Sequence, residues 1–355
     1  MGGAAPTLAK ERTPRDFYRH LNRFVVGQER AKRAISIAAY NHGQRIAAKR
    51  AGQAPQICKS NVLLVGPTGS GKTHLARHLA SALDVPFAAV DATEYTEAGY
   101  YGRDVEQIVT ELLLASGRDV ARCEEGVIFI DEVDKIARRM QTLDNGSGGR
   151  DIGGEGVQHA LLKLLEGREV FVPNHPKAGW DKDDHTVVDT SNILFICAGT
   201  FSELSGSMHK GRAGFARKAS RDRLPNRRLT HRDLYRFGMV EEFLGRLPVV
   251  VQLDPLTEEE MVEILTKTPD NIVGEFRRRL ALDKVEIDFR DDAFMPMVQY
   301  AQEQGLGARG LRGVVEEVME NLLFEAPQMP TGSFTIDREF VLARLRGAGA
   351  TLDVR

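Results

Sequence analysis

Residues 61–73, NVLLVGPTGSGKT, combine residue types that can bind phosphate with the spacing that this chemistry needs. Residues 66–73 fit the pattern G-x-x-x-x-G-K-[ST], in which a strand leads into a glycine-rich loop and then a helix. The backbone N–H groups of such a loop and the helix dipole attract phosphate oxygens, the lysine reaches the outer phosphates, and the hydroxyl binds Mg²⁺. The stretch therefore predicts a nucleotide-binding P-loop, although a glycine-rich turn can match this pattern by chance. Its expected cofactor-binding residues are Gly66, Pro67, Thr68, Gly69, Ser70, Gly71, Lys72, Thr73 and His74.

A pair of carboxylates, Asp131 and Glu132, follows the apolar run at 127–130. Nucleotide hydrolysis needs two such groups at a strand end beside the P-loop, because one holds Mg²⁺ through water and the other polarises the attacking water. Asp131 is expected in the first role, together with the Thr73 hydroxyl, and Glu132 in the second. An acidic pair after a buried strand can also serve only solubility, but its place downstream of a P-loop favours the catalytic interpretation.

The elements that would position these groups alternate between strands and helices. Short apolar runs predict strands at 61–65, 85–90, 126–130, 192–197 and 247–253. Helical periodicity predicts helices at 14–24, 29–50, 105–116 and 155–166. This alternation is typical of an α/β core with a parallel sheet. The polar, glycine-rich stretch at 138–154 predicts a loop, and residues 1–12 are expected to form a disordered leader.

A second, smaller domain is expected after residue 254, where the sequence pattern changes. Helical patterns occupy 257–282, 291–304 and 308–325, and only 285–289 and 333–336 read as short strands. The sequence thus predicts a nucleotide-binding domain at 13–254 and a mostly helical α+β domain at 255–355.

Composition excludes several classes of protein. The 355-residue chain is 42% hydrophobic and 28% charged, which is ordinary for a soluble protein with two cores, and its net charge of −2 argues against a wholesale nucleic-acid binder. The three cysteines, Cys58, Cys123 and Cys197, form no C-x-x-C pair, so we expect neither a zinc knuckle nor a disulfide framework, and a cytoplasmic location. No apolar run approaches the ~20 residues of a membrane helix, and the start of the chain lacks the regions of a signal peptide.

Ten sequence blocks in one order carry a resemblance to a known family. They are FVVGQERAK (24–32), AAYNH (38–42), GPTGSGKT (66–73), DVPF (84–87), DATEYTEAGYYG (91–102), FIDEVDKI (129–136), GEGVQHALLKLLEG (154–167), VDTSNILFICAGTF (188–201), EEFLGRLPVV (241–250) and GARGLR (307–312). In these blocks the chain resembles the ClpX-type AAA+ unfoldases, the ATPase subunits of the Clp protease. The resemblance implies an AAA+ fold with ATP and Mg²⁺ as cofactors. It also implies a homo-oligomeric ring, expected as a hexamer, that threads unfolded or tagged protein substrates through an axial pore towards a ClpP-like peptidase.

The same resemblance assigns roles to single residues outside the P-loop. Val25 and Val26 with Gln28 would line the adenine pocket. Arg246 matches the arginine finger that completes the neighbouring subunit's site, and Arg309 matches the sensor arginine of the small domain. A planar guanidinium that keeps its charge suits phosphate charge spread over several oxygens, although either arginine could instead form a surface ion pair.

Three further positions concern substrate and a first sensor. Tyr100 and Tyr101, between two glycines, match the axial pore loop, where aromatic rings can grip any polypeptide. Tyr101 takes a place that is usually aliphatic, and Arg150 falls in the second pore loop. The first sensor is expected near Thr190 or Thr200, and the motif does not choose between them.

The sequence departs from the family pattern at three places. No cysteine-rich zinc-binding domain precedes the core in this sequence, which leaves adaptor docking and part of substrate selection open. The expected pore-entrance loop, usually Arg-Lys-His, reads PNHPK at 173–177 and has fewer positive charges. The expected peptidase-docking tripeptide is Ala213, Gly214 and Phe215, in which alanine replaces a larger aliphatic residue. Weak or altered coupling to a ClpP-like peptidase is therefore expected.

Rival interpretations explain fewer features. HslU is one alternative family, but its large insertion has no room between the P-loop and the acidic pair of this sequence. A nucleic-acid motor would use the basic run at 210–236, but this run has only two aromatic residues, Phe215 and Tyr235, and no helix-turn-helix signature. Neither nucleic acid nor a membrane is therefore expected as a partner. A scaffold without hydrolysis conflicts with the presence of Asp131, Glu132, Arg246 and Arg309. A remodelling ATPase that acts without a peptidase remains the alternative.

Overall fold

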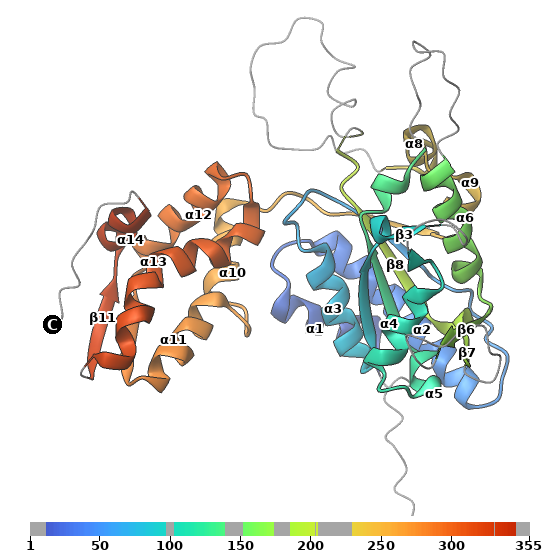
Figure 1. Cartoon of the computed structure of the whole chain (residues 1–355), viewed down its shortest axis with the longest axis horizontal. Helices are drawn as coiled ribbons and strands as arrows, with labels where there is room; N and C mark the ends of the chain where they lie inside the picture. Colours follow the sequence, from blue (N-terminus) through green and yellow to red (C-terminus); the bar gives the residue numbers. More distant parts are fainter. Residues whose placement is uncertain are drawn as a thin grey trace, which may run out of the picture. The chain divides into compact units, whose positions relative to one another are not determined.

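The computed structural model describes residues 12–96, 103–138, 152–173, 185–202, 204, 229–329 and 331–345. The chain divides into two compact units (Figure 1). The first comprises Met1–Leu21, Glu29–Pro67 and Lys72–Asp254, and the second comprises Asn22–Gln28, Thr68–Gly71 and Pro255–Arg355. Among the described residues, no helix has both the length and the apolar character needed to cross a membrane.

The main elements up to Asp254 are α1 (Pro14–Phe24), α2 (Glu29–Arg50), β1 (Val62–Val65), α3 (Lys72–Leu83), β2 (Phe87–Asp91), β3 (Tyr95–Thr96), β4 (Arg103–Asp104), α4 (Gln107–Ala115), α5 (Val120–Cys123), β5 (Val127–Asp131), the 3₁₀ helix η2 (Val133–Ile136), α6 (Ile152–Glu166), β6 (Glu169–Pro173), β7 (His185–Asp189), η4 (Thr190–Asn192), β8 (Leu194–Gly199), α8 (His231–Phe237), α9 (Glu241–Gly245) and β9 (Val249–Gln252). The predicted strands and helices of this region are all present. The β3–β4 and β6–β7 pairs are additions that the periodicity did not reveal.

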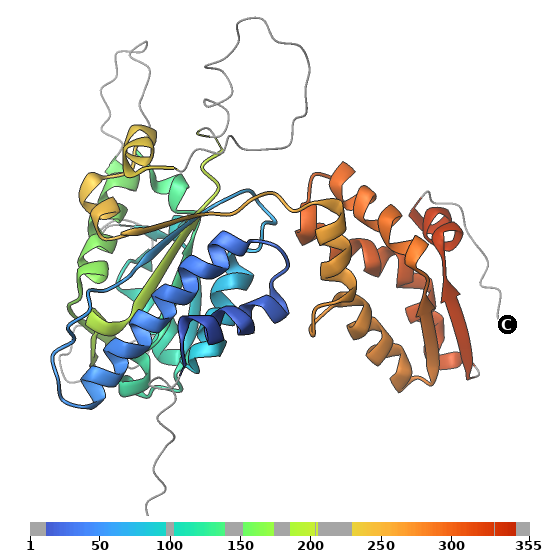
Figure 2. The ribbon, with the colours of Figure 1, turned by 180° about the vertical axis from the view of Figure 1, so that it is seen from behind.

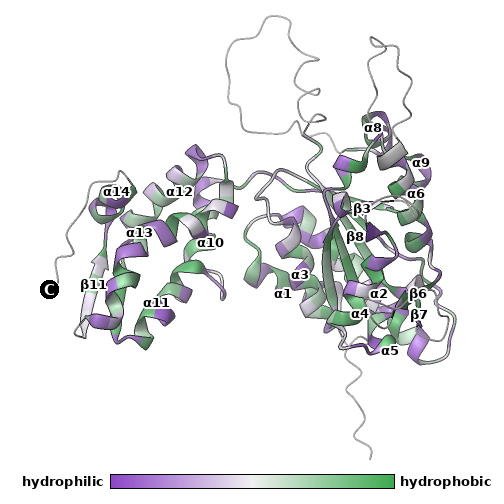
Figure 3. Cartoon of the chain, viewed as in Figure 1, coloured by the Kyte–Doolittle hydropathy of each residue, from purple (hydrophilic) through white to green (hydrophobic). Residues whose placement is uncertain are grey.

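Five strands form one parallel sheet in the order β2-β5-β8-β1-β9. Alternate residues of β1 face opposite sides. Leu63 and Val65 belong to the core that α4 and α6 also line, and α2 and α3 pack together on the other face (Figures 1 and 2). Because both faces are covered, the strands are continuous apolar runs, as the hydropathy colouring shows (Figure 3). The predicted α/β P-loop fold with a parallel sheet is confirmed.

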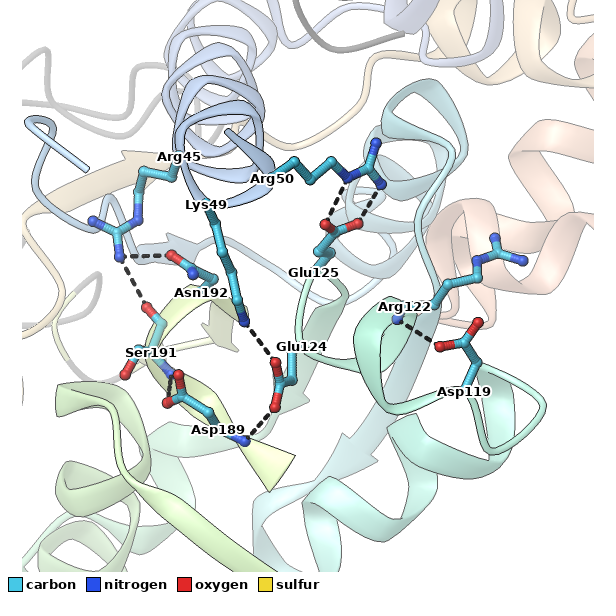
Figure 4. Close-up of polar contacts among 10 residues, drawn as sticks. All are labelled: Arg45, Lys49, Arg50, Asp119, Arg122, Glu124, Glu125, Asp189, Ser191 and Asn192. Atoms are coloured by element: carbon cyan, nitrogen blue, oxygen red, sulfur yellow. Dashed lines mark hydrogen bonds and ion pairs between the residues drawn. The ribbon is translucent and has the colours of Figure 1, made fainter. Parts of the chain in front are cut away.

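Charged residues fasten the amino-terminal edge of this sheet (Figure 4). Near the end of α2, Lys49 contacts Glu124 at 2.5 Å and Arg50 pairs with Glu125. The Glu124 carboxylate also accepts a hydrogen bond of 2.9 Å from the backbone N–H of Asp189. These contacts link α2, the turn before β5 and the end of β7. They therefore connect three elements at the amino-terminal edge of the sheet.

The region from Pro255 onward contains α10 (Glu258–Thr266), α11 (Ile272–Leu282), β10 (Val285–Phe289), α12 (Phe294–Glu303), η6 (Gly307–Gly310), α13 (Leu311–Glu325), β11 (Gly332–Ile336) and α14 (Arg338–Leu345). Its helices enclose their own core, and β10 pairs with β11 in parallel.

The expectation of one helical run at 257–282 is wrong, because the chain breaks between α10 and α11. Asn271 caps the second helix by accepting a hydrogen bond of 2.6 Å from the N–H of Gly274. Pro269 lies in the connecting turn and cannot continue a helix.

Candidate functional site

The P-loop follows β1 and leads directly into α3. Gly69 and Gly71 have φ values of +80° and +91°, a region that favours glycine, and this allows the backbone to curl. Space does not restrict Gly71, since a Cβ there would meet nothing within 4 Å, so its backbone conformation alone requires glycine. The sequence pattern G-x-x-x-x-G-K-[ST] therefore corresponds here to a curled loop before a helix.

Two polar side chains inside the loop fit a phosphate ligand. Lys72 is 8% exposed, and its ammonium donates hydrogen bonds to the carbonyl oxygens of Gly66 at 2.7 Å and Pro67 at 3.0 Å. The Ser70 hydroxyl is buried and has no hydrogen-bond partner among the described residues. A buried hydroxyl of this kind suits an additional ligand, because burial without a partner is costly. The loop thus offers a cation and a hydroxyl beside a helix amino terminus.

The carboxylates predicted for hydrolysis lie at the carboxyl end of β5, across β8 from the P-loop strand. Asp131 Oδ2 lies 3.5 Å from the Thr73 hydroxyl, and Asp131 Oδ1 accepts a 2.9 Å hydrogen bond from the Glu132 N–H. A hydroxyl and a carboxylate in this arrangement match the oxygen ligands of Mg²⁺. Both motifs therefore meet at one edge of the sheet, as their positions after parallel strands predicted.

Glu132 adopts a left-handed backbone conformation, with φ of 57° and ψ of 30°. Such a conformation is uncommon for a residue other than glycine and often marks a functional site. The sequence contained no signal for it, because the conformation depends on how η2 packs after the strand.

Thr200 and Thr190 lie at opposite ends of β8, which separates the two sensor candidates. Thr200 follows β8 at the edge that carries the P-loop, and its hydroxyl donates a 2.8 Å hydrogen bond to Asp134 Oδ2. Thr190 precedes β8, is buried, and donates to the carbonyl oxygen of Leu164 at 3.1 Å. Of the two residues, only Thr200 therefore lies at the sheet edge that carries the P-loop. The signal was available, since ligands bind at the carboxyl ends of parallel strands.

Arg246 lies at the opposite edge of the sheet from the P-loop of its own chain. Its carbonyl oxygen accepts a 3.1 Å hydrogen bond from the side chain of Asn61, the residue just before β1. The four residues of β1, roughly 13 Å of strand, separate this contact from the P-loop. The Arg246 side chain is 54% exposed, and its guanidinium pairs with Glu166 at 2.7 Å. The resemblance assigned Arg246 to the neighbouring subunit's site, and this role stays a prediction.

The other predicted nucleotide-site residues lie in the connection between α1 and α2, in α3 and in η6. Val25, Val26 and Gln28 form the connection between α1 and α2, in which Gln28 has a positive φ of 56°. His74 lies in the first turn of α3, where its ring meets that of His78 with centroids 4.3 Å apart. Arg309 is an exposed residue of η6.

Several predicted substrate-binding residues lie outside the described part of the chain. These are Tyr100, Tyr101 and Arg150, the tripeptide Ala213, Gly214 and Phe215, and most of the pore-entrance loop at 173–177. Their roles stay predictions from the sequence.

Known proteins share both parts of this arrangement. Residues 58–250 match the AAA domain of the Cdc48 subfamily, and residues 256–331 match the C-terminal, D2-small domain of ClpB protein.

Full-length relatives extend the similarity. The chain is 42% identical to the ATP-dependent Clp protease ATP-binding subunit ClpX 2 of Wolinella succinogenes, across 88% of this chain and 78% of that protein. It is 42% identical to the ClpX subunit of Treponema denticola, across 89% of this chain and 78% of that protein. It is 40% identical to the ClpX subunit of Porphyromonas gingivalis, across 95% of this chain and 84% of that protein. With the P-loop and the acidic pair together at one sheet edge, the chain belongs to the ClpX family of AAA+ nucleotide-binding ATPases and is an ATP-dependent unfoldase of that type.

Proposed function

We propose that the chain hydrolyses ATP with Mg²⁺ at the carboxyl edge of its parallel sheet and works as a hexameric ring. The supporting observation is the separation of Arg246 from the P-loop by the length of β1. An arginine side chain bound to Glu166 at the other edge does not complete the site of its own chain. It is exposed, however, and can serve the site of an adjacent subunit.

The residues of the site divide the chemistry between them. Lys72 and the amides of the P-loop bind the β- and γ-phosphates, and Thr73 and Asp131 would hold Mg²⁺, which neutralises phosphate charge. Glu132 orients the attacking water as a hydrogen-bond acceptor. Arg246 of the adjacent subunit and Arg309 stabilise the charge that develops on the transferred phosphate.

Val25, Val26 and Gln28 complete the nucleotide site at the adenine ring. We infer this role from their sequence match and from the position of these residues in the connection between α1 and α2. In this proposal residues 13–254 form the large AAA+ domain and 255–355 the small one.

Substrate handling follows from the same ring. Tyr100 and Tyr101 grip an unfolded or tagged protein in the axial pore, with Arg150 in the second pore loop, and the ring passes the protein to a ClpP-like peptidase. The relatives of this chain are named as subunits of the Clp protease, which supports a peptidase partner.

A cytoplasmic location fits the cysteines. Cys123 and Cys197 are free and buried, and burial raises the pKa of each thiol to about 12. Thiols of this kind act as small apolar core residues, as expected in a reducing compartment.

An unfolding assay with a tagged, stable substrate tests this function. Wild-type protein should unfold the substrate only with ATP, and excess single-stranded DNA should not compete. Glu132→Gln should still bind ATP, because Lys72 and the loop amides are intact, but it should hold the nucleotide without turnover. Inhibition by DNA would favour a nucleic-acid motor, and wild-type turnover by Glu132→Gln would exclude the proposed role of this carboxylate.

A further inference from the structure

Asp134 is a buried carboxylate between the two loops that carry the proposed water-orienting and phosphate-sensing groups. It lies in η2, two residues after Glu132, and is 8% exposed. Its Oδ2 atom accepts a 2.8 Å hydrogen bond from the Thr200 hydroxyl and a 3.2 Å hydrogen bond from the Phe201 N–H. One carboxylate oxygen therefore joins the loop after β5 to the loop after β8.

Both joined loops contain a residue with strained backbone. Glu132 has φ of 57° and Phe201 has φ of 48°. Conformations of this kind are unfavourable outside glycine and persist only where surrounding contacts fix them. The Asp134 carboxylate accepts a hydrogen bond from the N–H of Phe201. The carbonyl oxygen of Glu132 accepts a hydrogen bond of 2.9 Å from the N–H of Lys135 in η2.

The other oxygen of Asp134 is buried without a hydrogen-bond partner among the described residues. It lies against Gly199, where an added Cβ would approach it to 2.7 Å. The carbonyl oxygen of Gly199 in turn accepts a 3.1 Å hydrogen bond from the N–H of Gly66 at the start of the P-loop. A buried carboxylate with one unbonded oxygen contributes little to stability, because its hydrogen bonds offset only part of the cost of removing it from water. Its contacts therefore point to a role at the site rather than in the core.

The direction of the Thr200 hydroxyl proton has a chemical consequence. Because this proton is donated to Asp134, the Thr200 oxygen presents lone pairs to any further partner. A water molecule needs hydrogen-bond acceptors for its protons if its own lone pair is to face a phosphorus atom. Glu132 supplies one acceptor in the proposed mechanism, and an oriented Thr200 supplies a second.

We propose that Asp134 is a positioning residue for hydrolysis, which fixes the Thr200 hydroxyl as an acceptor and holds the Thr200 and Glu132 loops at a constant separation. This inference rests on the proposed ATPase site. It assigns no direct contact with nucleotide to Asp134.

The test compares Asp134→Ala with a matched buried aspartate, Asp233→Ala. Asp233 is also 8% exposed and also accepts from a threonine hydroxyl, at 2.7 Å, and from a backbone N–H, at 3.0 Å, but it caps α8. Asp134→Ala should lower kcat for ATP by on the order of 100-fold, with ADP affinity within about threefold of wild type. Asp233→Ala should lower the melting temperature while kcat of the folded protein stays within about threefold.

Two more variants distinguish a positioning role of Asp134 from a general loss of folded structure. Asp134→Asn keeps an oxygen acceptor for both bonds and should retain kcat within about fivefold. Thr200→Val should lose as much kcat as Asp134→Ala, and the double variant should lose little more than either, because both act through one hydroxyl. Thr200→Val also decides the question if Asp134→Ala does not fold.

The failure of this inference differs from the failure of the proposed function. Wild-type kcat in folded Asp134→Ala or Thr200→Val, with turnover abolished in Glu132→Gln, would overturn the role of Asp134 alone. Additive losses in the double variant would also overturn it, since they would show that Asp134 acts independently of Thr200. Wild-type turnover in Glu132→Gln would instead refute the proposed site.

Discussion

At the scale of single residues, His42 gives the structure a defined response to pH. Its ring is fully buried, and its Nε2 atom lies 2.9 Å from the carbonyl oxygen of Glu125. Because a carbonyl oxygen only accepts, Nε2 carries a proton in the neutral ring. Burial lowers the pKa of His42 from 6.5 to about 4, with the nearby cations Lys59 and Arg45 acting in the same direction.

This lowered pKa predicts a loss of stability in acid. The unfolded chain takes up the proton near pH 6.5 and the folded chain only near pH 4, so stability is complete above pH 6.5 and falls between these values. The contribution of His42 to the loss reaches about 3 kcal/mol at pH 4. Urea unfolding between pH 8 and 5 should show a flatter pH dependence for His42→Asn than for wild type. The matched substitution at the exposed His159, His159→Asn, is the control. An equal pH dependence of stability for His42→Asn and wild type would contradict the prediction.

At the scale of elements, Glu124 is the junction of the charged cluster at the amino-terminal edge of the sheet (Figure 4). It binds Lys49 of α2 and the N–H of Asp189 at the end of β7, and its side chain is 16% exposed. Glu124→Ala should lower the free energy of unfolding by about 1–3 kcal/mol, because it leaves the partly buried N–H of Asp189 without its acceptor. Nucleotide affinity should not change, since the P-loop lies at the other edge.

A surface ion pair supplies the comparison for this prediction. Glu111 contacts Arg103 at 2.5 Å, but its side chain is 38% exposed. Glu111→Ala should cost at most about 1 kcal/mol. Denaturant titrations of both variants measure the difference in the free energy of unfolding. Equal losses would mean that Glu124 does not link α2 to the end of β7.

At the scale of the whole molecule, the position of Arg246 predicts that two inactive variants restore each other. Arg246→Ala keeps a complete P-loop, and Lys72→Ala keeps the arginine, so a mixed ring contains some sites with both. An arginine finger contributes roughly 3 to 5 decades of rate in related nucleotide hydrolases. Mixing the two variants should therefore restore measurable ATPase activity above either alone. Absence of activity at every mixing ratio would argue that one chain completes its own site.

The sequence of the predicted docking loop at 213–215 indicates weak coupling to a peptidase. Burial of a Val- or Ile-sized side chain contributes roughly 1.5–3 kcal/mol, and Ala213 retains only a fraction of this. The proposed ring would present the predicted docking loop at 213–215 from several subunits, so a loss of ~1 kcal/mol per contact would multiply through avidity. Binding of a ClpP-like peptidase, measured by interferometry, should be weak for wild type and tighter for Ala213→Ile. Nanomolar binding by wild type that Ala213→Ile leaves unchanged would refute the prediction.

Local sequence patterns predicted those parts of the site whose residues are neighbours in the chain. The glycines at 69 and 71, the following lysine and the acidic pair after an apolar strand are local patterns, and each depends on backbone geometry within a few residues. Alternating strands and helices then implied a parallel sheet, which brings such strand ends to one edge. The fold and the chemistry of that edge could be predicted for this reason.

Contacts between residues far apart in the chain could be identified only from the three-dimensional arrangement. The bond between Thr200 and Asp134 spans 66 residues, and the bond between Asn61 and the Arg246 carbonyl spans 185. Both depend on the order β2-β5-β8-β1-β9, which no local pattern encodes. The left-handed conformation of Glu132 likewise results from packing after β5. Strand order and long-range packing therefore placed Thr200 at the nucleotide edge of the sheet and Arg246 at the opposite one.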